Sequence, residues 1–309
     1  MKRKGKLILV FFLSVSIVII NFLVNFHSLF VLPLRESELK IKVHFCPSEY
    51  CETIFEEILS SSNRSIHCAL YRFQLSKYDY LKRNDLDVKL VIDKSSPSIR
   101  IGEKINYGTR QLMHNKFCVI DRKVVITGSF NPVIRSLKDL NNLIVIHSYY
   151  LSKNYEDEFN ELWNNEFGSG EPTSKPLILF DSSSIQSYFC PEDYCSKHVI
   201  KVIESARNSV YFMTFTFTHP DIAEALVERK NVGVEVKGII EKSTKNKWSK
   251  FDYLKENGID VRLDSYPHRL HHKVFIIDNK TVITGSFNPT LSGDKRNDEN
   301  ILIIKNETI

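Results

Sequence analysis

One segment of nineteen residues occurs twice in this chain, and the duplication limits the folds that the sequence can adopt. Residues His114–Pro132 read HNKFCVIDRKVVITGSFNP and residues His271–Pro289 read HHKVFIIDNKTVITGSFNP, with 13 of the 19 positions identical. Both copies contain His-x-Lys-x4-Asp followed by Gly-Ser-Phe-Asn-Pro. The repeat predicts two similar folding units that each contribute to a functional site. A duplicated structural hairpin without chemistry is the alternative.

Other features repeat around the two motifs in the same order. The cysteine phrases Phe45–Cys51 and Phe189–Cys195 begin 144 residues apart, and the motif histidines are 157 apart. Strand-like apolar runs alternate with amphipathic helical runs, which predicts an α/β fold of two similar repeats with mixed β-sheets. We expect a helix after each cysteine phrase and another between the second and third strands of each half. The predicted strands are 41–45, 66–71 and 88–92 in the first half, and 177–180, 210–215 and 234–240 in the second.

Each motif is expected to form a β-hairpin. Apolar β-branched runs flank Asp121–Lys123 in the first copy and Asp278–Lys280 in the second, a pattern typical of two strands joined by a tight turn. The resulting division is an N-terminal anchor over residues 1–36, a first repeat over 37–168 and a second repeat over 169–309.

The N-terminal segment has the composition of a membrane span. No Asp, Glu, Lys or Arg occurs from Leu7 to Leu34, and a helix of about 20 residues crosses the roughly 30 Å hydrocarbon core of a bilayer. The basic cluster before it predicts a single-pass protein with a cytoplasmic N-terminus and the globular part outside the cytoplasm. Cleavage as a signal peptide is the alternative.

Charge gives no general argument for nucleic-acid binding. Four of the 42 basic residues precede the apolar segment, and the remaining 38 nearly balance the 37 acidic ones. A case for nucleic acid therefore depends on local patches rather than on net charge.

The six cysteines divide into two equally spaced pairs and two single residues. Outside the cytoplasm, Cys46 with Cys51 and Cys190 with Cys195 can each close a short disulfide. One zinc site built from these four thiolates, or reduced structural cysteines, are the alternatives. Cys68 and Cys118 lie inside apolar strands and are expected to be core residues.

The motif residues suit the handling of phosphate. Residues two apart on a strand point to the same face, so His114 with Lys116, and His271 with Lys273, each present an imidazole and an ammonium together. Imidazole can attack phosphorus when neutral or donate a proton when charged. The lysine can neutralise the nonbridging oxygens as charge grows in the transition state. No metal or other cofactor is expected.

The remaining polar positions of the motifs have supporting roles. The expected ligands of the substrate phosphate are Ser129, Asn131, Ser286 and Asn288. Asp121 and Asp278 stand at an odd separation from their lysines and are expected to hold the hairpin strands together. In the second copy His268 and His272 are expected to be bystanders, because only His271 has the correct spacing to Lys273 and Asp278.

This double His-Lys-Asp signature resembles the phospholipase D superfamily, and its compact form with Gly-Ser-x-Asn resembles the bacterial endonuclease and mitochondrial phospholipase D branch. The resemblance extends over roughly residues 40–304. It implies that both motifs meet across a pseudo-twofold axis in one active site, without metal and without an obligate partner chain. It also implies that the His, Lys and Asp of both motifs form the catalytic set. One histidine, expected to be His114, becomes phosphorylated, and the other protonates the leaving group.

The family also uses an acidic residue of the closing strand to orient its histidine. Glu299 matches this residue in the second half, whereas Asn141 replaces it in the first. A carboxylate raises the pKa of a partner imidazole, and an amide orients the ring without adding charge. The two histidines are therefore expected to titrate apart, with His271 either the better acid or the more basic nucleophile.

The substrate is less well defined than the chemistry. The loop Glu241–Lys250 contains four lysines and Trp248, which suits a nucleic-acid strand. A solvated basic loop with Trp248 packed on the next helix is the alternative. We expect a phosphodiesterase that acts on nucleic acid. A phospholipase D that releases phosphatidate is the alternative, and an inactive phosphate- or lipid-binding module is the third possibility.

Overall fold

The computed structural model describes residues 33–74, 79–96, 105–108 and 111–306. The chain divides into two compact units, Met1–Leu34 and Arg35–Ile309. All helices and strands described below lie in the second unit, apart from Leu34, the first residue of strand β1. None of the described residues belongs to a helix that is long and apolar enough to cross a membrane. Nearly all of the predicted anchor lies outside the described residues.

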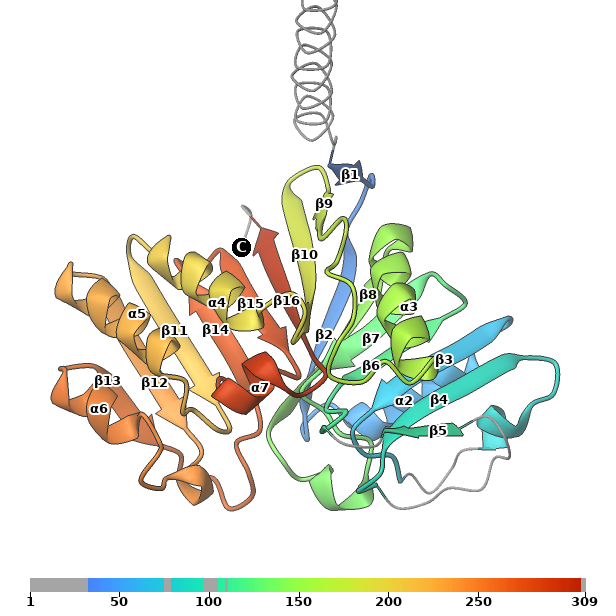
Figure 1. Cartoon of the computed structure of the whole chain (residues 1–309), viewed down its shortest axis with the longest axis horizontal. Coiled ribbons are helices and arrows are strands. Elements are labelled where there is room, and N and C mark those ends of the chain that lie inside the picture. The colour runs from blue at the N-terminus through green and yellow to red at the C-terminus, as the bar shows by residue number, and fades with distance from the viewer. Residues whose placement is uncertain (1–32, 75–78, 97–104, 109–110, 307–309) are drawn as a thin grey trace, which may run out of the picture. The chain divides into compact units, whose positions relative to one another are not determined.

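Two mixed sheets form the framework of the second unit (Figure 1). The seven-stranded sheet has the order β2-β8-β7-β6-β3-β4-β5 and the nine-stranded sheet the order β1-β9-β10-β16-β15-β14-β11-β12-β13. The strands of the first are β2 Lys40–Cys46, β3 Ser65–Leu70, β4 Asp87–Asp93, β5 Ile105–Gly108, β6 Lys116–Ile120, β7 Val124–Gly128 and β8 Asn141–His147. Those of the second are β1 Leu34–Arg35, β9 Leu177–Leu179, β10 Ser183–Cys190, β11 Ser209–Thr214, β12 Glu235–Ile240, β13 Asp260–Leu263, β14 Lys273–Ile277, β15 Thr281–Gly285 and β16 Glu299–Asn306.

The helices cover the sheets unequally. They are α2 Cys51–Ser60, α3 Tyr149–Trp163, α4 Cys195–Glu204, α5 Pro220–Asn231, α6 Phe251–Glu256 and α7 Leu291–Lys295. Apolar side chains of α2 form one core with the seven-stranded sheet, and those of α4 and α5 form the other with the nine-stranded sheet. The amphipathic helix α3 packs across β3, β4, β6 and β7, and it is drawn in light green in Figure 1.

The strand pairing confirms an α/β fold with two similar halves. β3 pairs with β4 in parallel and with β6 antiparallel, and β11 pairs with β12 and β14 in the same way. Both predicted hairpins are present, as β6–β7 and β14–β15. Their turns carry positive φ angles at Asp121, Arg122, Asp278 and Asn279, which is the backbone conformation of tight hairpin turns.

Two expectations about the elements are wrong. The strand that precedes the second cysteine phrase is β10, which pairs with β16 as β2 pairs with β8. The predicted run 177–180 is instead the short neighbouring strand β9. Strand β10 was not predicted because it begins with serines, which have no strong strand preference. It forms a strand because it pairs with the apolar strand β16. In the first half, the described residues between β3 and β4 contain the short 3-10 turn Asp79–Lys82, where the second half has α5.

The cysteines form three disulfide pairs. Cys46 with Cys51 and Cys190 with Cys195 close their own phrases, with Cα–Cα distances of 5.6 and 5.7 Å. This pairing leaves no set of four thiolates for the alternative zinc site. Cys68 and Cys118, expected only as core residues, face each other across β3 and β6 and also pair.

Candidate active site

The two motif histidines line one cleft between the halves. The cleft has a volume of about 770 Å³, and both His114 and His271 contribute to its wall. Basic residues from both halves surround it, namely Arg72, Arg135, Lys242, His268 and Arg269, together with the acidic residues Asp139 and Glu241. The structure therefore brings the two copies of the motif to a common site.

His114 is held by a carboxylate from the other half of the chain. Its Nδ1–H donates to Oε2 of Glu299 over 2.8 Å, and Glu299 is fully buried. Because a carboxylate only accepts, this contact places the ring proton on Nδ1 and leaves the Nε2 lone pair available. Lys116 Nζ lies 3.1 Å from that Nε2 and also donates to the His114 carbonyl oxygen over 2.7 Å.

His271 has an uncharged partner, again from the opposite half. Its Nδ1 lies 2.8 Å from Oδ1 of Asn141 and 3.1 Å from the carbonyl oxygen of Ser129. The partners of the histidines are thus exchanged between the halves. The expectation that Glu299 changes the behaviour of His271 is wrong, because its carboxylate contacts His114.

Backbone hydrogen bonds explain this exchange. The His114 N–H donates to the carbonyl oxygen of Asp298, the residue immediately before Glu299. In the same way, the His271 N–H donates to the carbonyl oxygen of Leu140, immediately before Asn141. Each histidine segment therefore lies beside the closing strand of the other half, a long-range pairing that sequence spacing does not reveal.

The motif serines and asparagines differ in what they contact. Ser286 Oγ donates to Glu299 over 2.6 Å, and Ser129 Oγ donates to Asn141 over 3.0 Å. Both serines are fully buried, so their hydroxyls support the histidine partners instead of facing the cleft as phosphate ligands. Among the described residues, the buried Oδ1 atoms of Asn131 and Asn288 have no hydrogen-bond partner. Phosphate oxygens only accept hydrogen bonds, so these amides could bind a phosphate only through their Nδ2 donors.

Burial and mutual repulsion set the charge state of the centre. Burial, followed by the neighbouring Lys116, lowers the pKa of His114, although Glu299 opposes this. Burial, Lys273 and Lys116 lower the pKa of His271 well below its usual value, with no carboxylate partner to oppose them. Burial lowers the pKa of Lys116 to about 7 and also lowers that of Lys273. An anionic substrate would offset this repulsion and favour the cationic forms.

The motif aspartates lie at the hairpin turns and bind backbone amides. Asp121 accepts hydrogen bonds from the N–H groups of residues 63–65, and Asp278 from those of residues 207–209. These bonds lower the pKa of both carboxyls against the effect of partial burial. The contacts fix each hairpin to the strand beside it and leave the reacting groups to the histidine and lysine.

Two carboxylates, those of Asp93 and Glu241, hold the backbone just before the motif histidines, and the sequence had predicted no such role for them. Asp93 accepts the N–H of Met113 over 3.0 Å, and Glu241 accepts the N–H of Leu270 over 2.7 Å. Each carboxylate thereby binds the residue immediately before a motif histidine. The sequence contains a signal for these two carboxylates, because Ile92–Ser95 reads IDKS and Ile240–Ser243 reads IEKS, 148 residues later.

An aromatic ring flanks each motif histidine. Tyr71 contacts His114 and Phe215 contacts His271, both with ring centroids 4.7 Å apart and an interplanar angle of 57°. The same rings lie 5.2 Å from Nζ of Lys116 and Lys273 respectively, within the range of a cation–π contact.

The remaining residues near the second motif bear on the bystander role expected for His268 and His272 and on the alternative in which Trp248 packs on the next helix. His268 lines the cleft, whereas His272 is directed away to Asn142, 3.2 Å from its Oδ1. Trp248 is 69% exposed and does not pack on the next helix, while Lys247 Nζ lies 5.0 Å from its ring. From the loop Glu241–Lys250, the cleft wall includes Glu241, Lys242 and Ser243.

Comparisons with known proteins agree with this architecture. The family model described as "Cardiolipin synthase, PLD-like domain" matches residues 55–163 and 199–309. A "Phospholipase D" from Rickettsia prowazekii (strain Madrid E) is 39% identical over 197 residues, which cover 63% of this chain and 88% of that relative. The "Mitochondrial cardiolipin hydrolase" of Chlamydomonas reinhardtii is 34% identical over 101 residues, covering 32% of this chain and 45% of that protein.

A solved structure supports the fold over most of the chain. The phosphatidylserine synthase of Haemophilus influenzae Rd KW20 has a TM-score of 0.68 at 14% identity, covering 86% of this chain and 82% of that one. The family model matches both halves and more than half of the chain. The chain therefore belongs to the phospholipase D superfamily of phosphodiester hydrolases.

Proposed function

We propose that this chain hydrolyses phosphodiesters through a phosphohistidine on His114 and that its substrate is a nucleic-acid strand. The observation that supports the chemistry is the unequal pairing of the two histidines in one cleft. His114 carries a buried carboxylate partner, which stabilises the positive charge that its ring acquires on attack. His271 carries an amide, which orients the ring without this stabilisation.

The proposed reaction has two steps. In the first, Nε2 of His114 attacks phosphorus, the bond to the leaving oxygen breaks, and His271 gives that oxygen its proton. In the second, water attacks phosphorus, His271 takes the proton of the water, and the phosphorus–nitrogen bond breaks to return free His114. The diester must displace Lys116 from His114 Nε2 for attack to begin, and its negative charge favours the protonated form of His271.

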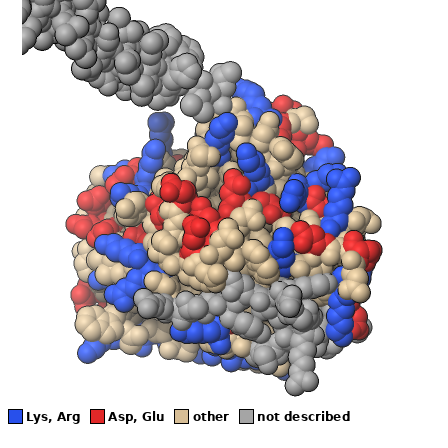
Figure 2. Space-filling model, turned by 45° about the vertical axis from the view of Figure 1, so that its right-hand side comes forward, with Lys and Arg blue, Asp and Glu red and all other residues tan. Residues whose placement is uncertain are grey.

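The cleft favours a polyanionic strand. Arg72, Arg135, Lys242 and Arg269 line it, and they outnumber its two carboxylates, Asp139 and Glu241. Elsewhere, on the face drawn in Figure 2, Lys and Arg are interspersed with Asp and Glu. Local charge in the cleft therefore supports the proposal, with tracking of the phosphate backbone by arginine and lysine.

A phospholipid substrate is the second candidate, because relatives of this chain are named phospholipase D and cardiolipin hydrolase. In the test, the full-length wild type and His114→Ala are each incubated in EDTA with single-stranded DNA, with RNA or with phospholipid vesicles, and the products are measured. Cleavage of a strand with steep salt dependence is expected. Release of head group and phosphatidate without strand cleavage would support the lipid instead. A chain that also fails to hydrolyse bis(p-nitrophenyl) phosphate would be the inactive binding module.

The histidine assignment has its own test. Rapid acid quenching during turnover of a ³²P-labelled diester, followed by peptide mapping, is expected to place the label on His114. Label on His271 would contradict the assignment while leaving the two-step chemistry intact.

A further inference from the structure

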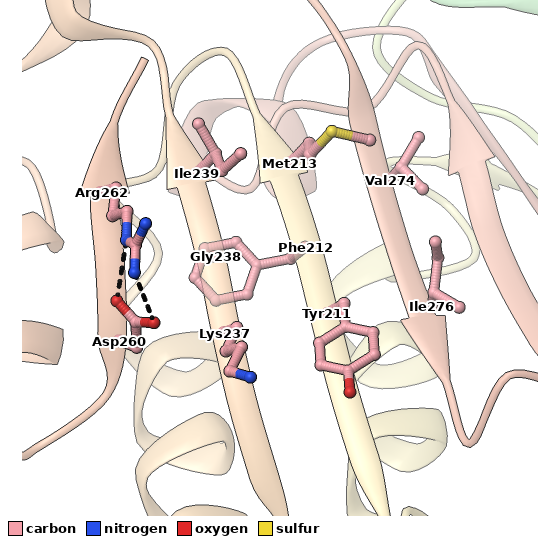
Figure 3. A pocket seen from close by; sticks show the side chains of 10 residues that line it. All are labelled: Tyr211, Phe212, Met213, Lys237, Gly238, Ile239, Asp260, Arg262, Val274 and Ile276. Atoms are coloured by element: carbon pink, nitrogen blue, oxygen red, sulfur yellow. Dashed lines mark hydrogen bonds and ion pairs between the residues drawn. The ribbon is translucent and has the colours of Figure 1, made fainter. Parts of the chain in front are cut away.

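The outer face of the nine-stranded sheet has an open groove at β11–β14 (Figure 3). The groove has a volume of about 410 Å³ and lies outside the active-site cleft. Its wall includes Met213, Ile239, Val274 and Ile276, and Ile239 is 38% exposed. An isolated apolar residue at the surface is ordinary, but a continuous apolar strip across several strands is typical of a binding surface.

The first half contains the equivalent face in a covered state. Pairing of β3 with β4 and β6 matches that of β11 with β12 and β14, so His67, Lys89 and Val91 correspond to Tyr211, Lys237 and Ile239. Likewise Phe117 and Val119 of β6 correspond to Val274 and Ile276 of β14. In the first half helix α3 packs over this face, and Val91 and Val119 are fully buried there.

The contacts of α3 show which chemistry this face accepts. Phe159 stacks on His67 with ring centroids 4.9 Å apart, and Tyr155 meets Phe117 edge-on at the same distance. Lys89 Nζ lies 5.9 Å from the Trp163 ring. The covering helix thus presents a row of aromatic rings at helical spacing, together with the buried Glu156, which bonds His67 Nδ1 over 2.9 Å.

The second half retains the features that such a helix uses. Lysine is kept at Lys237, ready for an aromatic partner like the one Lys89 has. Tyr211 provides a ring in place of His67, and Met213 fills the volume where the first half has the smaller Ala69. The polar side chains at the rim, Glu235 with Lys237 and Asp260 with Arg262, form ion pairs with each other. The rim is therefore nearly neutral, which does not favour nucleic acid or anionic lipid.

We propose that this groove binds an amphipathic helix of a protein partner, one that presents a row of aromatic side chains at i, i+4 and i+8 as α3 does. The neutral rim and the apolar strip fit a helix laid across β14, β11 and β12, as α3 crosses β6, β3 and β4. This surface is independent of the catalytic cleft, so binding there and hydrolysis can be measured separately.

The test uses the full chain and a labelled peptide with the sequence of residues 148–164. A lactam joins the side chains of Lys153 and Asp157, which are exposed in α3 and one turn apart, so the free peptide is helical. Circular dichroism verifies this before use. Fluorescence anisotropy is expected to show saturable binding, and a peptide with Phe159→Ser and Trp163→Ser is expected to lose it.

Variants of the chain locate the binding site. Ile239→Glu is expected to weaken binding by at least about tenfold. Val232→Glu, at a position that is 65% exposed and outside the groove, is the matched control and is expected to bind as wild type does. Hydrolysis of bis(p-nitrophenyl) phosphate by both variants verifies folding. The absence of saturable binding, or equal binding by Ile239→Glu, would contradict the proposal. A wild-type dimer that Ile239→Glu dissociates would identify a second copy as the occupant and would also overturn it.

Discussion

Replacing Glu299 by glutamine tests whether the crossed carboxylate activates His114. The change removes one charge and keeps the size of a fully buried side chain that contacts His114 Nδ1 over 2.8 Å. Hydrogen bonds to a charged group contribute about 1.5–3 kcal/mol. Each 1.36 kcal/mol corresponds to tenfold in rate. If this interaction develops with the charge on His114 in the transition state, kcat should fall roughly 10- to 150-fold.

The assay is release of p-nitrophenolate from bis(p-nitrophenyl) phosphate by the full chain, with kcat and KM measured from pH 5 to 9. Melting temperature serves as the folding control, since glutamine can still accept the hydroxyl of Ser286. Asn141→Asp is the mirror change and places a carboxylate beside His271. It should raise the pKa of that imidazole and extend activity to higher pH, because the proposed acid stays protonated longer. An unchanged kcat in folded Glu299→Gln would refute the reasoning.

Four other predictions follow from named contacts. Asp93→Asn should lower kcat about tenfold with little change in KM, because the segment before His114 loses a charged acceptor, and steady-state kinetics checks this. The alkaline side of the kcat/KM profile should combine loss of the proton from His271 with loss of the proton from Lys116 near pH 7, and Lys116→Arg should remove only the second component. Opening Cys68–Cys118, which closes 50 residues, should lower the free energy of unfolding by about 4 kcal/mol in denaturant titrations, against about 2 kcal/mol for the five-residue loop of the first cysteine phrase. Protease added to intact cells should digest the globular part, as the basic residues before the apolar N-terminal segment predict.

Short sequence patterns were sufficient to predict many of the strands and both motif hairpins. The hairpins at Asp121 and Asp278 were predicted because turn residues between β-branched runs act over a few positions. Strand β10 was missed because its serine-rich start becomes a strand only when it pairs with β16, more than a hundred residues later. The helix expected between β3 and β4 shows that a sequence repeat does not ensure a repeated element, because the described residues there contain only the 3-10 turn Asp79–Lys82.

The candidate site shows the same limit at the level of single side chains. His114 and Lys116 share a strand face, so their proximity was readable from a spacing of two residues. That Glu299 contacts His114, and not the histidine of its own half, depends on backbone bonds to the closing strand opposite. Asp93 and Glu241 stood in a repeated phrase, but their bonds to Met113 and Leu270 required the folded structure.

The exchange of histidine partners explains how two nearly identical motifs can perform different steps. Each half supplies a histidine together with the partner of the other histidine, so neither half contains a complete catalytic group. A change in one half therefore alters the histidine of the other half. Asn141, in the first half, gives His271 an uncharged partner in place of a carboxylate. The contact between Glu299 and His114 is unaffected. Under the proposed mechanism, a single carboxylate-to-amide difference distinguishes the nucleophile from the acid, while the motif aspartates bind backbone amides in the same way in both halves.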